Sequence, residues 1–150
     1  MKYLFQDIKL KNKKVYIAGP MTGIEDLNEK AFRDVEAMLK DLGAIPITPH
    51  DYTYNTLDPR LNLDVLKLHC RDDDDYYYRL GCINVLYSDL VVTLKNINNS
   101  KGGMKEVAMA VAHGIPIISD HEVYLRWWDS IHARSNTISF DVFGSNVNIN

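Results

Sequence analysis

Short β-rich segments alternate with amphipathic segments along most of this 150-residue chain, and this alternation constrains the fold more than any other feature. The segment Leu-Val-Val-Thr-Leu at residues 90–94 is almost entirely apolar, which is typical of a strand covered on both faces in a parallel sheet. Three further runs have strand composition, at residues 15–18, 44–48 and 115–119. The alternation predicts a three-layer α/β fold with a mostly parallel sheet of four or five strands. No linker divides residues 1–150, so we expect a single domain.

Helical spacing of apolar side chains accounts for most of the segments between these strands. Residues 28–42 have this spacing and are followed by Gly43, a typical helix C-cap. A second helix is expected to begin within the four-aspartate run at residues 72–75, because aspartate suits an N-cap and the positive end of the helix dipole. The simplest interpretation of that run is a solvated helix start. The other predicted helices span residues 104–113 and 123–131.

Two segments lack a clear helical or strand period. Residues 50–64 are rich in Asn, Asp, Pro and Tyr, which predicts a long irregular loop of the kind that is usually functional. The tail after Arg134 is polar apart from an alternating patch at Ile138, Phe140 and Val142. This patch predicts either a fifth strand or a C-terminal arm, at about residues 135–150, that contacts a partner.

The composition excludes several classes of protein. Seventeen basic and 20 acidic residues give a formal net charge of -3, without the basic face that a duplex nucleic-acid binder needs. Only two cysteines are present, Cys70 and Cys82, so a disulfide framework and a zinc site are not expected. The five histidines are scattered, and no metal or other cofactor is expected. No apolar run is long enough to span a membrane and the start lacks a secretory signal, so we expect a cytoplasmic protein.

The first candidate site follows the first predicted strand, because ligands of such sheets lie beyond the carboxyl ends of the strands. Gly19-Pro20-Met21-Thr22-Gly23 contains two glycines that permit close backbone approach, and the following helix would direct N–H groups toward an anion. A simple tight turn would have the same sequence.

The second candidate site follows the strand at residues 90–94. Glu106 is expected in or near the first turn of the next helix, where the helix dipole favours an ionised carboxylate. Gly102 and Gly103 remove side-chain bulk beside it, although an acidic residue at a helix start is also common for stability alone. Asp89, just before the same strand, either contributes to the site or simply caps a turn.

Three ordered segments carry a resemblance to a known family: residues 16–23, 88–92 and 100–106, followed by Ala110 and residues 113–116. Together they resemble the nucleoside 2-deoxyribosyltransferase superfamily. The chain is most similar to a small branch, often phage-encoded, that is usually labelled only as a domain of unknown function. The resemblance covers about residues 13–120 and leaves out the long loop and the C-terminal arm.

This resemblance implies a flavodoxin-like fold, self-association into a dimer or larger homo-oligomer, and cleavage or transfer at the N-glycosidic bond of a nucleoside or nucleotide. Glu106 matches the family nucleophile, a carboxylate that holds the sugar as an ester, and Asp89 matches an acidic position that orients or protonates the base. The monophosphate-using relatives place the first loop against sugar and phosphate. The substrate-binding positions implied are Tyr16, Gly19, Pro20, Met21, Thr22, Gly23, Ser100, Gly102 and Gly103.

One departure from the family pattern opens a second hypothesis. Relatives carry an aspartate that assists the leaving base, and here that position is Gly81. Loss of a general acid costs about 10²- to 10⁴-fold in rate, so the alternative is a nucleotide-binding module that has lost turnover. Asp74 is a poor substitute, because it would lie about 10 Å further along the helix axis. Tyr77 and Tyr78, next to Arg79, either stack on a base, contact phosphate or serve packing.

A third hypothesis belongs to a different class. A structural interaction protein would use the helix that carries Trp127 and Trp128, together with the C-terminal arm, and would bind no nucleotide.

Overall fold

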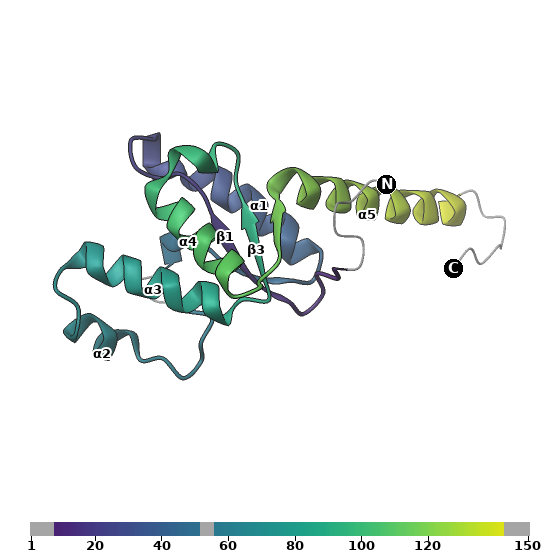
Figure 1. The fold of residues 1–150 in the computed structure, drawn as a ribbon. Helices are drawn as coiled ribbons and strands as arrows, with labels where there is room; N and C mark the ends of the chain where they lie inside the picture. Colours follow the sequence, from purple (N-terminus) through teal and green to yellow (C-terminus); the bar gives the residue numbers. More distant parts are fainter. Residues whose placement is uncertain (1–7, 52–55, 143–150) are drawn as a thin grey trace.

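The computed structural model of the chain describes residues 8–51 and 56–142, with side chains as far as Arg134. These residues form a parallel sheet between two layers of helices, a Rossmann-like three-layer α/β fold (Figure 1). The strands are β1 (Lys14–Ala18), β2 (Ile45–Ile47), β3 (Leu90–Thr93) and β4 (Ile117–Ser119). The α-helices are α1 (Glu29–Asp41), α2 (Leu63–Leu68), α3 (Asp73–Tyr87), α4 (Lys101–Ala112) and α5 (Asp120–Val142). Short 3-10 turns are η1 (Glu25–Asn28), η2 (Pro49–Asp51) and η3 (Ile97–Asn99).

The strand order, β2-β1-β3-β4, places the point where the strand order reverses between β1 and β3. All pairings are parallel, and Ala18 at the end of β1 lies beside Thr93 at the end of β3. The N–H of Leu94 donates to the carbonyl of Ala18 at 2.8 Å, so the two strands deliver their loops side by side. In open α/β sheets this reversal point is where ligands bind.

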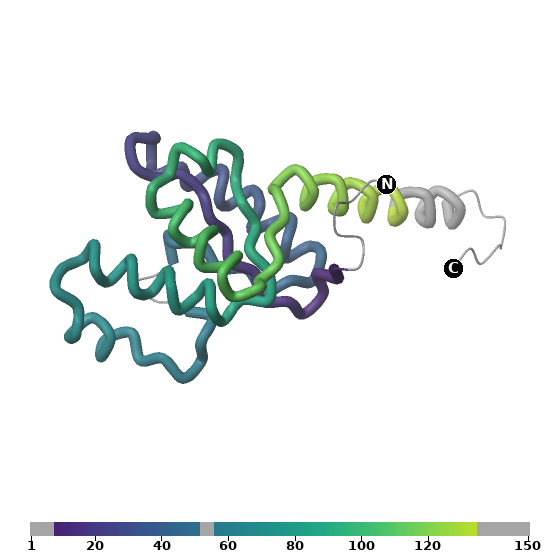
Figure 2. The backbone as a smooth tube through the Cα atoms, in the orientation of Figure 1, coloured from purple at the N-terminus to yellow at the C-terminus, as the bar shows by residue number. Residues whose placement is uncertain are grey.

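Alternation along β1 divides the hydrophobic core into two clusters. Val15 and Ile17 face the layer of α1 and α5, where Phe32 and Leu39 are fully buried. Tyr16 and Ala18 face the opposite layer, which α3 and α4 supply. The helices α3 and α4 lie against each other over this second face (Figure 2). The second face therefore contains the residues that the sequence singles out.

The predicted strands and the first two predicted helices are confirmed with small shifts at their ends. The predicted loop at residues 50–64 is interrupted by the start of α2, whose first turn is capped by the Asn62 side chain accepting from the Val65 N–H at 3.1 Å. Leu63 and Leu66 then pack against the second core cluster. This short helix was missed because its cap and its apolar pair span less than two turns.

The C-terminal prediction of a fifth strand is wrong for the described residues. The backbone remains helical from Asp120 to Val142, through the alternating patch. A helix that has already formed adds each residue at little cost, and a five-residue alternation with no neighbouring strand does not outweigh that. The helix extends away from the sheet (Figure 1), and residues 143–150 of the predicted arm lie outside the described part. Among the described residues, no helix has both the length and the apolar composition to cross a membrane.

Candidate active site

A glutamate on α4 and a tyrosine on β1 form the centre of the site. The Tyr16 hydroxyl donates a hydrogen bond to Oε2 of Glu106, which joins residues 90 positions apart in the sequence. Tyr16 is fully buried because β1 is an inner strand of the sheet and this side chain points to the face that α3 and α4 cover. Glu106 shares one side of α4 with the buried residues Gly103 and Ala110, so helical spacing turns its carboxylate toward the strand.

The surroundings of Glu106 change its acidity. Burial raises the pKa of this carboxyl from 4.5 to about 7, and the Tyr16 hydrogen bond opposes the shift because it favours the charged form. The helix dipole is not the cause. The helix α4 begins at Lys101, with the Ser100 side chain accepting from the Gly103 N–H at 2.9 Å, so Glu106 lies beyond the first turn. The sequence placed Glu106 in or near the first turn, and the structure places it just beyond that turn, in the second.

Gly81 on α3 provides the space that this carboxylate occupies. A Cβ atom at position 81 would lie 2.8 Å from Glu106 Oε2 and 3.7 Å from the Tyr16 hydroxyl oxygen. The first distance is shorter than any ordinary van der Waals contact, so a side chain here would push the carboxylate away from Tyr16. The sequence marked Gly81 only as a missing aspartate, whereas the structure shows it as a neighbour of the proposed nucleophile.

Three further side chains of α3 and α4 form a series of contacts that begins at Glu106. Burial raises the pKa of the Cys82 thiol, and the nearby negative charge of Glu106 raises it further. Tyr78 is hydrogen-bonded to Cys82, and Nζ of Lys105 lies 5.5 Å from the centroid of the Tyr78 ring. Tyr78 and Lys105 also line an open pocket of about 490 Å³, together with Arg71, Asp72, Asp74 and Asp75.

The four-aspartate run at the start of α3 has two different environments. Asp72 caps the helix, its side chain accepting from the Asp75 N–H at 2.8 Å, as the sequence predicted. Asp75 is buried, and Arg71 and Arg79 hold the pKa of its carboxyl well below the usual range. For Asp75 the interpretation as a solvated helix start is wrong, because its carboxylate is enclosed by two guanidinium groups.

The loop that follows β1 has a buried start and an exposed tip. Gly19 is required by packing, since a Cβ there would lie 2.6 Å from a methyl group of Leu94, whereas Thr22 and Gly23 are exposed. The loop does not lead directly into an α-helix as expected. The turn η1 intervenes, and Asn28, in a left-handed conformation, donates to the Pro20 carbonyl at 2.9 Å.

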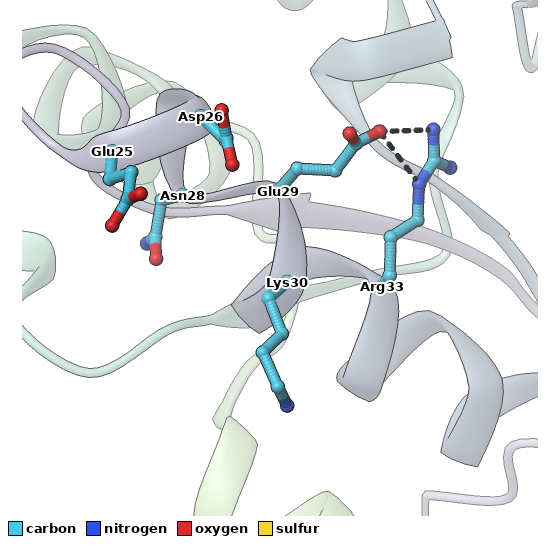
Figure 3. Close-up of a pocket in the computed structure, with 6 residues that line it drawn as sticks. All are labelled: Glu25, Asp26, Asn28, Glu29, Lys30 and Arg33. Carbon is cyan, nitrogen blue, oxygen red and sulfur yellow. Dashed lines mark hydrogen bonds and ion pairs between the residues drawn. The ribbon is translucent and has the colours of Figure 1, made fainter.

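Beside this loop lies a second open pocket, of about 510 Å³, lined by Glu25, Asp26, Asn28, Glu29, Lys30 and Arg33 (Figure 3). Its two cationic side chains are already paired. Arg33 contacts Glu29, Glu36 and Asp51, which raises its pKa further, and Lys30 pairs with Asp34 at 2.7 Å. The pocket therefore has no uncommitted cation among its described lining residues for a phosphate group.

The glycines of the second predicted loop differ from each other. A Cβ at Gly103 would lie 2.6 Å from Ile97 Cδ1, so this glycine serves packing. Gly102 faces open space, with no atom within 4 Å of an added Cβ. Gly102 thus leaves an open surface at the start of α4, on the same edge of the sheet as the loop after β1.

Asp89 lies apart from this arrangement. It stands at the amino end of β3, where its carboxylate accepts from the Lys14 N–H at 2.9 Å and its own N–H donates to the Lys14 carbonyl at 2.8 Å. These contacts hold the start of β1 against β3. A role for Asp89 with the leaving base stays a prediction, and its observed contacts are those of the simpler interpretation.

The comparison with known families covers the whole of this geometry. Residues 13–119 match the family described as Domain of unknown function (DUF4406). The chain belongs to this family. The matched range contains Tyr16, Gly81 and Glu106, so the DUF4406 domain holds the complete Tyr16–Glu106 centre. No curated protein matches the chain.

Within this DUF4406 domain, the sequence missed the part that Cys82 and Lys105 play around Glu106. The sequence pointed to these two residues only through their neighbours: Cys82 follows Gly81 and Lys105 precedes Glu106, in two helices that pack together. No group of three or more His, Cys, Asp or Glu side chains in the described part of the chain is arranged to hold a metal ion.

Proposed function

We propose that this chain cleaves or transfers the N-glycosidic bond of a nucleoside 5′-monophosphate or a related nucleotide, through a covalent glycosyl ester on Glu106. The observation that carries the proposal is a partly buried carboxylate held by a fully buried tyrosine hydroxyl beside the reversal point of the sheet. The resemblance of the three ordered segments to the nucleoside 2-deoxyribosyltransferase superfamily supports the same assignment. The open pocket that Tyr78 and Lys105 line connects to the site through Cys82, whose thiol is near Glu106 and hydrogen-bonded to Tyr78.

The reaction uses the ionised form of Glu106. One carboxylate oxygen attacks the anomeric carbon C1′, a C1′–O bond forms, and the C1′–N bond breaks with its electron pair moving to the base. Water or a second base then attacks C1′ and releases the carboxylate. The Tyr16 hydroxyl engages Oε2 and holds the carboxyl group in one orientation, so Oε1 is the oxygen that we assign to the attack.

Gly81 favours the second candidate, a nucleotide-binding module without turnover. Because position 81 faces Oε2 of Glu106, an aspartate there in a relative would lie close to the departing base, and this chain has no side chain in that place. A nucleotide that stays bound to the purified protein without being cleaved would favour this candidate.

The decisive experiment compares base release by the wild type with release by two glutamate variants. Glu106→Gln keeps the shape of the side chain but cannot form the ester, so it should reduce base release at least about 10³-fold. Glu36→Gln is the matched control, because Glu36 is also buried but lies on α1, across the sheet. Full activity in Glu106→Gln would overturn the assignment. A melting shift with one nucleotide and no release by the wild type would select the binding module.

The pH dependence tests the role of Tyr16. Since the attacking group must be ionised, kcat/KM should rise with pH up to a plateau above about 7. Tyr16→Phe removes the hydrogen bond that lowers the pKa of Glu106. The rising limb should therefore move to higher pH, whereas a purely structural role for Tyr16 would lower the activity without moving the limb.

A further inference from the structure

The structure bears on the chemical class of the leaving base, an inference that rests on the proposed function. When the C1′–N bond of an ordinary neutral nucleotide breaks, the base departs with a negative charge unless an acid protonates it. The question is therefore which group near Glu106 can deliver a proton.

In the described part of the chain, Glu106 has no carboxylic partner. Burial raises its pKa and the Tyr16 hydrogen bond opposes that shift, with no contribution from a second carboxylate. Asp75 is held ionised by Arg71 and Arg79, and Asp89 lies on the Lys14 amide. The Tyr16 proton is already donated to Glu106 itself.

Gly81 leaves a position of α3 that faces the Glu106 carboxylate without a side chain. The added Cβ at this residue is the one that points at the Glu106 carboxylate, at 2.8 Å from Oε2. The absence of a side chain there lets the carboxylate rest on Tyr16 and leaves the departing base without a carboxylic acid at this position. Tyr78 and Cys82, also on α3, carry O–H and S–H groups near Glu106, but their raised pKa values make them weaker acids than usual. Among the described residues, Glu106 is therefore held in place for attack and no carboxylic acid faces it.

We infer that the substrates are nucleotides whose base is cationic before cleavage, such as a pyridinium ribosyl group or an N7-alkylated purine. Such a base needs no proton. As Glu106 bonds to C1′, the electron pair of the C1′–N bond neutralises the positive ring, and the base leaves uncharged. Water then attacks C1′, the ester bond breaks, the carboxylate is regenerated and one proton passes to solvent.

The open pocket that Tyr78 lines is suited to a positive aromatic ring. Tyr78 lies three residues before Gly81, about 4.5 Å along the axis of α3, and its exposed ring already has the ammonium group of Lys105 5.5 Å from its centroid. Asp72 and Asp74 line the same pocket, where the positive charges are Lys105 and Arg71, and Arg71 is paired with Asp75. A ring face that attracts cations, with carboxylates nearby, stabilises a cationic base more than a neutral one.

The test uses matched pairs of substrates that share the sugar and phosphate. Nicotinamide mononucleotide is compared with its reduced, neutral form, and 7-methylguanosine 5′-monophosphate with guanosine 5′-monophosphate. Each rate is divided by the rate in the Glu106→Gln variant, because cationic glycosides are also more labile in water. The cationic member should show a rate enhancement at least about 10²-fold larger, the lower end of what a general acid contributes.

A pair of variants at position 81 makes the test specific for the missing acid. Gly81→Ala and Gly81→Asp both add the Cβ that displaces Glu106, but only the aspartate adds a proton donor. Compared with Gly81→Ala, the Gly81→Asp variant should favour the neutral substrates at least tenfold more. Equal enhancement for neutral and cationic substrates in the wild type would overturn this inference and leave the proposed function intact. Absence of cleavage for all four substrates would overturn both.

Discussion

The two faces of the sheet contain similar amounts of chain but different kinds of side chain. The face covered by α1 and α5 has an apolar cluster against the sheet, with Val15, Ile17 and Phe32 fully buried. The buried carboxylates of these two helices, Glu36 and Glu122, are paired with arginines. The face covered by α3 and α4 is interrupted by polar groups, since Tyr16 and Glu106 meet in its interior. Both faces are served by the same strand, because alternate residues of β1 point to opposite sides.

This difference suggests that the two faces have different roles: one stabilises the fold and the other holds the reactive groups. Apolar burial stabilises the fold in proportion to the area removed from water, so the first face is where truncation should be most damaging. Burying a carboxylate destabilises its charged form, and the raised pKa of Glu106 reflects this destabilisation. A cost of this kind is typical of functional sites, and the measurements below test whether the two faces divide in this way.

The largest expected effect on stability lies on the apolar face. Phe32→Ala removes a fully buried aromatic ring that packs edge-on against His50 and should destabilise the fold by about 3–5 kcal/mol. Chemical denaturation followed by circular dichroism measures this. A loss below about 1 kcal/mol would show that the apolar face does not carry the stability.

The next largest effect is a pH-dependent gain in stability when Glu106, on the polar face, is replaced by glutamine. Glu106 has a folded pKa of about 7 against an ordinary value of 4.5, so the folded state keeps a proton that the unfolded state releases. The wild type should therefore lose stability, on the order of 3 kcal/mol, as pH rises from about 4.5 to 7. Glu106→Gln lacks this loss, and its melting temperature should exceed that of the wild type at pH 8 but not at pH 4. Identical pH profiles of stability for the two proteins would show that burial does not raise the pKa of Glu106.

The smallest expected effect distinguishes two helical glycines. Gly102→Ala adds a methyl group in open space at the start of α4 and should stabilise the fold by about 0.5 kcal/mol. Gly81→Ala has a similar helical gain, but it presses on Glu106 Oε2, so its net change should stay within about 1 kcal/mol while base release falls. Thermal melts and base release of both variants measure this. Unchanged release in Gly81→Ala would show that the carboxylate tolerates displacement.

The sequence predicted the fold better than the site. The strand composition of residues 90–94 and the helical spacing of residues 28–42 are local signals, and both elements formed close to their expected bounds. Glu106 was singled out by the glycines before it, by its match to the family nucleophile and by an expected place in or near the first turn of a helix. The Ser100 cap starts α4 earlier than expected, so Glu106 lies in the second turn. The tail was misjudged because a short alternation weighed more in the prediction than the continuing helix α5.

What the sequence by itself determined is the set of local elements and the edge of the sheet at which to look, because both depend on spacing within a few residues. Only the tertiary structure decided that Tyr16 and Glu106 share a hydrogen bond and that Gly81 leaves room for it. These three residues come from β1, α3 and α4, and no pattern along the chain encodes their separation in space. Their meeting depends on the strand order and on the packing of α3 against α4, where a difference of one Cβ atom decides whether the carboxylate fits.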